Sequence, residues 1–388
     1  MSNTITNLIP DFYRALDVVS RELAGFIPSV ARDPAADRVA DGQTLRIPIA
    51  PANAAGGDIT PAMSLPAASD QVLGNVAVTI AKNRYWPFSW NGSQQQAVNM
   101  GPGFLTLQQD QIAQAIRAAI NEIETDVANA TYVKASRAYG TAATTPFGTA
   151  GNYSDAAEVG KILDDNGAPK SDRSLIVNTA AGAKIRGFQA QAQMAGDAGL
   201  QRQGVLFDIN GFTIRESAQV PTVTAGAMAS ATTSVAALTV GQTVLPLATA
   251  GTGVVAAGDI ITLANDTNKY VVTAVSFAGA NPASGDSITI GAPGLRVAQS
   301  SAARAITVVA TAARNIALTR NSVLLATRLP AVPPEGDLAT DRMTVIDPVT
   351  GIAMELARYP GFRMNVYHLS VAWGVAVLKS EHIAVLLG

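Results

Sequence analysis

The chain has 388 residues, of which 48% are hydrophobic and 14% are charged, and its formal net charge is −2. This length predicts two or three domains, and the lack of cysteine excludes disulfides, thiolate zinc sites and cysteine nucleophiles. Because soluble domains carry about 25% charged residues, the low charge predicts that copies of the chain cover much of one another's surface.

Signals for export, membrane insertion and strong nucleic-acid binding are not found in the sequence. The first residues lack the basic patch and apolar run of a secretion signal, and no apolar stretch approaches the length needed to cross a bilayer. No run of Lys and Arg is present, so we expect only non-specific contact with nucleic acid.

Residues 8–27 predict an amphipathic helix that ends at Pro28. Their apolar residues recur at three- and four-residue spacing and form one stripe. The stripe consists of Leu8, Phe12, Leu16, Val19, Leu23 and Phe26. Such an arm either packs on its own domain or reaches over a neighbour.

Residues 29–104 are rich in Pro, Gly and Ala and predict a long two-stranded excursion. Residues 45–49 and 72–82 have the pattern of strands, and residues 51–66 between them form an open loop. Two strands alone are unstable in water, so the excursion needs a partner surface.

Four aromatic residues follow within six positions: Tyr85, Trp86, Phe88 and Trp90. A cluster of this kind can form a ligand platform. More often it anchors one element on another, and we favour that interpretation.

Residues 105–139 predict the longest helix of the chain, uninterrupted by Gly or Pro before Gly140. At 1.5 Å per residue it would span about 50 Å and form the backbone of an elongated subunit. Its buried stripe is predicted to contain Ile112, Ile116, Ile120, Ile123 and Val127.

Residues 154–221 follow a Gly/Thr-rich linker and predict mixed helix and strand. Ser154 is the expected cap of a helix, residues 174–178 form a short strand, and residues 180–195 form a second helix. Asn210-Gly211 predicts a tight hairpin turn, because both residues tolerate positive backbone angles.

Residues 222–309 form the most distinct block of the chain. Short apolar runs rich in Val and Thr alternate with Gly-Asp and Asn-Asp turns, which is typical of a small all-β barrel or sandwich. Mixed α/β character resumes afterwards, so the block is predicted to be an insertion in a host domain. Its only charged residues are Asp259, Asp266, Lys269, Asp286, Arg296 and Arg304.

Residues 310–388 predict one buried helix, at residues 321–327, and a Pro-rich loop at residues 329–336. A turn is expected at residues 347–351. The remaining apolar segments are predicted strands at residues 343–346, 352–357, 363–371, 373–378 and 382–387.

Residues that could carry chemistry are few, and no constellation of them is convincing. The only histidines are His368 and His382, and no Gly-x-Ser-x-Gly elbow accompanies them. Residues 251–256 fit a loose dinucleotide fingerprint but precede a strand instead of a helix. Residues 164–167 lack the ligand spacing of a calcium loop and suit a helix-ending turn. We therefore expect no catalytic, cofactor-binding or metal site.

The order of parts resembles that of the major capsid proteins of tailed bacteriophages, with the Hong Kong 97-type α+β fold. An inserted β-domain makes the coat-protein family of short-tailed Salmonella phages the nearest resemblance. The segments that carry it are TNLIPDFYRALDVVSRELAGFIPSV, GDIITLANDTNKYVVTAV and ARNIALTRNSVLLATRLPAVPPEGD. The resemblance covers essentially the whole chain.

The resemblance implies a role for each segment. It implies an N-terminal arm (1–40), an extended loop lying on a neighbour (41–90), a peripheral domain (91–153 and 341–370) with a spine helix (105–139), an axial domain (154–221, 310–340 and 371–388) and an inserted β-barrel (222–309). The residues expected at subunit interfaces are Phe12, Leu16, Leu45, Ile47, Val76, Val78, Trp86 and Trp90.

The resemblance also implies a structural function and a set of partners. The chain would assemble with itself, as hexamers and pentamers, into an icosahedral shell around double-stranded DNA. A scaffolding protein, a portal protein and expansion during packaging would belong to this process. Assembly would take place in the cytoplasm of the bacterial host, and the final location of the chain would be the capsid of the virion. Some relatives crosslink a loop lysine, but residues 41–81 contain none, so we expect a non-covalent shell.

Three other functions compete with this interpretation. An encapsulin-like nanocompartment shares the fold but would not usually carry the inserted barrel. An extracellular lattice or adhesin protein would suit the Ala/Thr/Gly-rich block, but the missing export signal and the long helix argue against it. An enzyme is disfavoured by the scarcity of catalytic residues.

Overall fold

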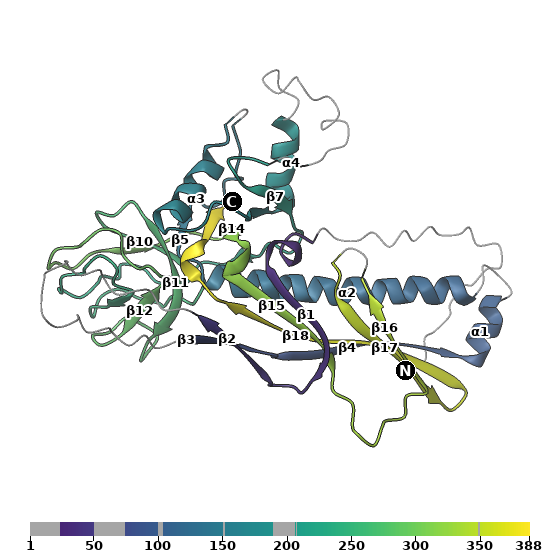
Figure 1. The fold of residues 1–388 in the computed structure, drawn as a ribbon. Coiled ribbons are helices and arrows are strands. Elements are labelled where there is room, and N and C mark those ends of the chain that lie inside the picture. The colour runs from purple at the N-terminus through teal and green to yellow at the C-terminus, as the bar shows by residue number, and fades with distance from the viewer. Residues whose placement is uncertain are drawn as a thin grey trace, which may run out of the picture.

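The computed structural model of this chain describes residues 24–49, 74–99, 104–149, 152–188, 206, 208–347 and 350–388. Figure 1 shows an elongated α+β molecule in which one long helix runs beside two sheets. The helix predicted for residues 8–27 lies outside the described residues except for its last four, which lead into the short 3₁₀ helix η1 (Ile27–Ser29).

The first sheet has six strands and follows the length of the long helix (Figure 1). Strand β1 pairs with β15 in parallel, and the other neighbours pair antiparallel. The strands are β1 (Ala31–Val39), β15 (Val323–Pro330), β18 (Met364–Val377), β17 (Ala353–Gly361) and β16 (Asp341–Ile346), with β4 (Lys82–Asn91) paired to β18.

The second sheet has eleven strands and joins the host domain to the block of residues 222–309. Its main path is β13 (Ile306–Val308), β10 (Ile260–Leu263), β11 (Lys269–Ser276), β5 (Arg137–Tyr139), β19 (Ile383–Leu387), β14 (Ala312–Thr319), β6 (Arg173–Val177) and β7 (Thr213–Glu216). Beside this path lie β8 (Thr222–Val223), β9 (Val244–Pro246) and β12 (Ser287–Ile290). Because β11 pairs with β5, the block continues the host sheet.

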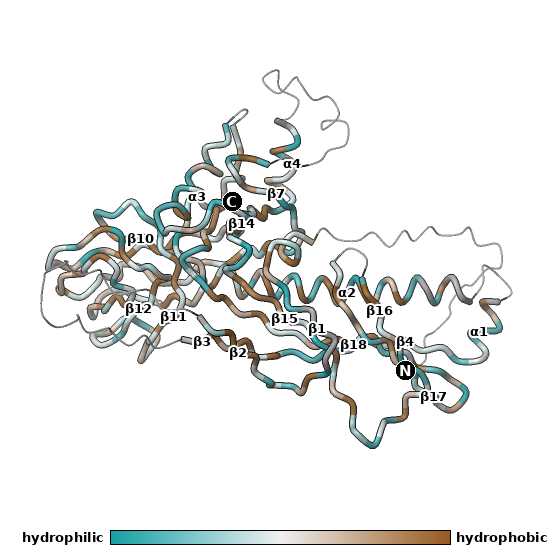
Figure 2. Tube along the Cα trace, in the orientation of Figure 1, coloured by the Kyte–Doolittle hydropathy of each residue, from teal (hydrophilic) through white to brown (hydrophobic). Residues whose placement is uncertain are grey.

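Helix α2 (Phe104–Val133) is the predicted long helix, and its 30 residues span about 45 Å. Figure 2 shows hydrophobic and hydrophilic residues alternating along it. Its stripe of Ile116, Ile120 and Ile123 is buried in the largest core cluster. The other helices are α1 (Gly92–Asn99), α3 (Ser154–Asp165), α4 (Thr179–Phe188) and the 3₁₀ helices η3 (Arg320–Ser322) and η4 (Ser380–His382). No helix in the described ranges is long and apolar enough to cross a membrane.

The predicted end of the long helix was wrong by six residues. The helix ends at Val133, and β5 follows at once. The Ser136 backbone N–H donates to the Ile383 carbonyl at 3.0 Å, and β5 then lies between β11 and β19. Pairing within the sheet therefore overrides the helical tendency of these last residues.

Several predicted strands and turns are confirmed. The two-stranded excursion is the hairpin of β2 (Thr44–Ile49) and β3 (Gly74–Thr79). Asn210 and Gly211 have the positive φ angles, 50° and 78°, that the predicted turn requires. The turn after β16 is closed by the Gly351 N–H, which donates to the Asp347 carbonyl at 2.8 Å. Gly167, with a φ of 74°, ends α3.

Three predictions for local structure were wrong. Residues 321–327 form the end of η3 and the start of strand β15 instead of a helix. The apolar run lies between β1 and β18 and forms backbone hydrogen bonds with both strands, which favours a strand. The two strands predicted at residues 363–371 and 373–378 are one strand, β18. Ser154 does not cap α3, whose cap position is Tyr153.

Gly374 in β18 allows another segment to cross the sheet closely. A Cβ atom there would collide with the carbonyl oxygen of Thr79 and would lie 3.1 Å from the Cα of Ile80. Ile80 is buried in the cluster under the β2–β3 hairpin. The glycine therefore sets how closely the base of the hairpin packs on β18.

We predict that Gly374→Ala lowers the free energy of unfolding by about 1–3 kcal/mol, because the added methyl group forces the crossing segments apart. Urea unfolding followed by tryptophan fluorescence measures this, since Trp86, Trp90 and Trp373 all lie in the six-stranded sheet. Gly187→Ala in α4 is the matched control, because a Cβ there meets nothing within 4 Å. Equal midpoints for the two variants would contradict the prediction.

Candidate functional site

The described residues do not gather the ligands of a metal site. No group of three or more His, Asp or Glu within them is placed to hold a metal ion. His368 lies in β18, where its ring stacks on Tyr85 at 4.8 Å and meets the tilted ring of Tyr359 at 4.9 Å. His382 lies in η4, and burial lowers the pKa of both histidines. The side chains with clear structural roles are those that fix the β2–β3 hairpin, β4 and the segment that enters β1.

The β2–β3 hairpin is one such segment. Its register pairs Leu45 with Val78 and Ile47 with Val76. Val78 is fully buried in a cluster with side chains of β1, β15 and β18, and Leu45 and Ile47 pack against the same cluster. Val76 is half-buried. The apolar face of the hairpin thus meets the six-stranded sheet of its own chain, and Val78 has no exposed surface left for a neighbour.

The aromatic cluster of β4 packs one element on another, as the sequence predicted. Its side chains stack on β18 in pairs: Trp86 on Trp373 at 6.3 Å and Phe88 on Tyr367 at 5.2 Å between ring centroids. Trp90 is 8% exposed, and its indole N–H donates to the Gln111 side chain of α2 at 2.6 Å. These contacts fasten β4 between β18 and the long helix.

The eight predicted interface residues are therefore not gathered in one place. Six of them lie on the hairpin and on β4, and all of these except Val76 contact the chain's own sheet or helix. Phe12 and Leu16 lie outside the described residues. An interface role for the surfaces that remain exposed stays a prediction.

Lys82, the first lysine of the chain, is held in place by acids of α2. Its ammonium lies 2.8 Å from an Asp126 oxygen, 3.4 Å from a Glu122 oxygen and 5.7 Å from the centre of the Trp373 ring. Burial alone would lower the pKa of Lys82, but the hydrogen bonds and charges of the two acids outweigh it and raise that pKa. The two acids therefore favour the protonated form of the amine.

Glu124 of α2 fixes the segment that enters β1, and sequence reasoning missed it. Its carboxylate accepts the backbone N–H groups of Gly25 at 2.5 Å, Phe26 at 2.6 Å and Ile27 at 2.9 Å, and the Ser217 hydroxyl at 3.0 Å. The side chain is buried, with the residue 1% exposed. We call residues 25–27 the arm root. The signal in the sequence was a charged residue beside the buried Ile123 of the apolar stripe.

The sequence itself matches no family model and no curated protein. Among solved structures, the chain is similar to the capsid structure of the Cyanophage P-SCSP1u, with a TM-score of 0.51 and 11% identity over 100% of this chain and 96% of that one. A structure from Mycobacterium phage Che8 is similar over 99% of this chain and 98% of that one, with a TM-score of 0.48 and 12% identity. The cyanophage match shows that this chain has an α+β fold of the Hong Kong 97 capsid type.

We predict that acidification stabilises the wild-type chain more than the Glu124→Gln variant. Burial raises the pKa of Glu124 above its usual 4.5, although four hydrogen-bond donors oppose this. The charged form therefore costs folding stability, and that cost disappears as the pH falls through the raised pKa. Each unit by which the pKa is raised contributes about 1.4 kcal/mol.

The measurement is the free energy of unfolding of each variant at a series of pH values between neutrality and 4.5. Glu335→Gln, at an exposed glutamate, is the control and should follow the wild type. Parallel curves for the wild type and Glu124→Gln would show that Glu124 does not titrate differently in the folded chain.

Proposed function

We propose that this chain is the major capsid protein of a tailed bacteriophage, a structural subunit that assembles with itself into an icosahedral shell. The observation that carries the proposal is the likeness to the cyanophage capsid structure, which extends over almost the whole of both chains. A likeness to a shell subunit from end to end favours assembly over catalysis.

The distribution of exposed apolar residues supports self-assembly. Large hydrophobic side chains on the surface gather in two stretches, one in the hairpins around β16 and β17 and one in the block of residues 222–309. A subunit with neighbours at both ends would cover them, because exposed apolar surface of this kind is costly in a free monomer. They include Leu338, Met343, Ile346 and Phe362 in the first stretch and Val235, Val240, Val244 and Val297 in the second.

We propose that the block of residues 222–309 is an inserted barrel domain. Its strands pair in the order β13, β10, β11, β12 and β9. Two further bridges, Thr233 to Leu247 and Thr232 to Ala305, link β9 back to the start of β13 and so support a closed ring. The ring surrounds a core cluster of its own, which includes Leu245, Tyr270 and Ile288.

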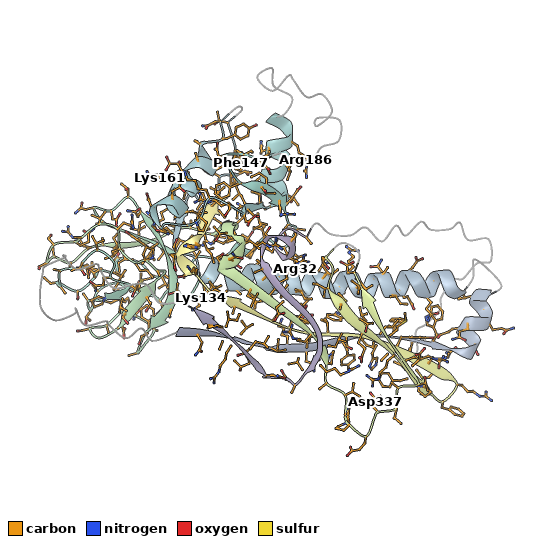
Figure 3. All side chains as sticks on the ribbon, viewed as in Figure 1. Arg32, Lys134, Phe147, Lys161, Arg186 and Asp337 are labelled. Carbon is orange, nitrogen blue, oxygen red and sulfur yellow. The ribbon has the colours of Figure 1, made fainter. Side chains whose placement is uncertain are left out.

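Strand pairing refines the proposed division of the host. Residues 323–330 and 364–377 belong to the sheet beside the long helix, which we assign to the peripheral domain. Residues 154–188, with β14 and β19, share a second core cluster, which we assign to the axial domain. Asp337, labelled in Figure 3 on the loop after β15, binds Arg342 and Tyr359, so this loop belongs with the peripheral sheet.

We further propose hexamers and pentamers of this chain, a scaffolding protein, a portal protein and packaged double-stranded DNA as its partners, and the virion as its location. The formal net charge of −2 suits a wall that touches DNA without binding it tightly. Many weak contacts between copies suffice for such a shell, because multivalency compounds them.

We predict that the expressed chain forms closed particles, tubes or spirals that electron microscopy detects. Coexpression with a scaffolding protein should make the particles uniform in size. A chain that remains monomeric at high concentration, with or without that partner, would contradict the proposal. Particles isolated from an infected host should contain double-stranded DNA, whereas enzyme cargo would point to a nanocompartment.

We predict that mature particles run as single chains on a denaturing gel. Residues 41–81 contain no lysine, and the Lys82 ammonium is paired with Asp126 and Glu122. A Lys82→Arg variant should therefore give particles with the same band pattern as the wild type. A ladder of covalent oligomers that disappears in this variant would overturn the non-covalent shell.

A further inference from the structure

Arg314 is a fully buried charge at the point where the chain enters and leaves the block of residues 222–309. We call residues 221–226 and 311–314 the neck. Here β8 pairs with Ala312 and Ala313, and the Arg314 backbone N–H donates to the Pro221 carbonyl at 2.9 Å. The Arg314 residue is 0% exposed, yet none of its three guanidinium nitrogens has a hydrogen-bond partner among the residues that the structure describes.

Asp259 is a buried opposite charge whose electrostatic influence reaches this guanidinium. Its carboxylate is buried, with the residue 2% exposed, and accepts the Gly226 N–H at 3.1 Å and the Ala256 N–H at 2.7 Å. The Asp259 charge acts on Arg314, where it opposes the lowering of the Arg314 pKa by burial. Asp259 therefore links the neck to the turn before β10. It makes no direct hydrogen bond to Arg314.

Tyr132, in the last turn of α2, completes the cluster. A Cβ atom at Gly258 would collide with its ring, so the turn before β10 packs directly on this side chain. Burial raises the pKa of Tyr132, Arg314 opposes this and Asp259 adds to it, so the phenol lies within electrostatic reach of both charges. The cluster thus joins three parts of the molecule: the neck, the block and the end of the long helix.

A buried guanidinium without hydrogen bonds is strongly unfavourable, because a charge removed from water must be both paired and hydrogen-bonded. Internal water molecules commonly satisfy such groups, each with about three hydrogen bonds to buried polar atoms. We propose that internal water bridges Arg314 to Asp259, and that this bridged charge pair fixes the block of residues 222–309 on the end of α2. The proposal does not depend on the function proposed for the chain.

Hydrogen–deuterium exchange of the folded chain tests the proposal at the two amides that donate to Asp259, Gly226 in the neck and Ala256 in the turn before β10. Arg314→Met keeps the length of the side chain but removes the charge, and it should speed exchange at Gly226 and Ala256 by about tenfold or more. Arg314→Lys restores the charge and should recover part of the protection. Arg296→Met is the matched control, because Arg296 is an exposed arginine of the same block, and it should leave these amides unchanged.

Two further measurements keep the proposal falsifiable if Arg314→Met does not fold. The first is the variant Asp259→Asn, alone and combined with Arg314→Met or Arg314→Lys. A bridged pair predicts that the combined effect on exchange is smaller than the product of the single effects. Independent effects, or slower exchange in Arg314→Met, would overturn the charge pair. The second is a structure that resolves ordered water, and a dry guanidinium there would overturn the bridge.

Discussion

The buried stripe of α2 is the contact on which the rest of the structure depends. Ile116, Ile120 and Ile123 enter one core cluster that also takes Trp373 from the six-stranded sheet and Ile383 from the eleven-stranded sheet. Each such side chain contributes about 1.5–3 kcal/mol when it is fully buried. The two sheets therefore share a core because both pack on the same helix, and the helix sets the long dimension of the molecule (Figure 1).

Apolar burial has no direction, so it cannot by itself fix how each part lies on the helix. Polar side chains of α2 provide that direction. Glu124 binds the arm root, and Asp126 accepts the Trp373 indole N–H at 2.9 Å and the Lys82 ammonium. The Tyr132 ring packs against the turn at Gly258. Within nine residues the helix thus orients the arm root, the six-stranded sheet and the block of residues 222–309.

The sequence predicted the elements with a clear periodicity and failed where long-range pairing decides. The apolar stripe of α2 and the alternating pattern of the β2–β3 hairpin were sufficient to predict a helix and two strands. The apolar run at residues 321–327, in contrast, suits a buried helix and a buried strand equally well. Of the site, the sequence predicted the packing role of the β4 aromatics. It did not predict the roles of Glu124, Arg314 or Gly374, because each depends on a partner far away in the chain, such as Thr79 for Gly374.

The hairpin illustrates why the proposed role as a shell subunit would need contacts within the chain as well as between copies. Two strands in water are marginal, but Val78 and Ile80 bury the base of this hairpin against Ala326 and Ala372. Gly374 allows the crossing that brings the base so close. These contacts fix the base of the hairpin on the six-stranded sheet. Closed symmetric assembly requires every copy to present its contacts at the same angle, and a hairpin anchored only by its neighbour could not ensure that.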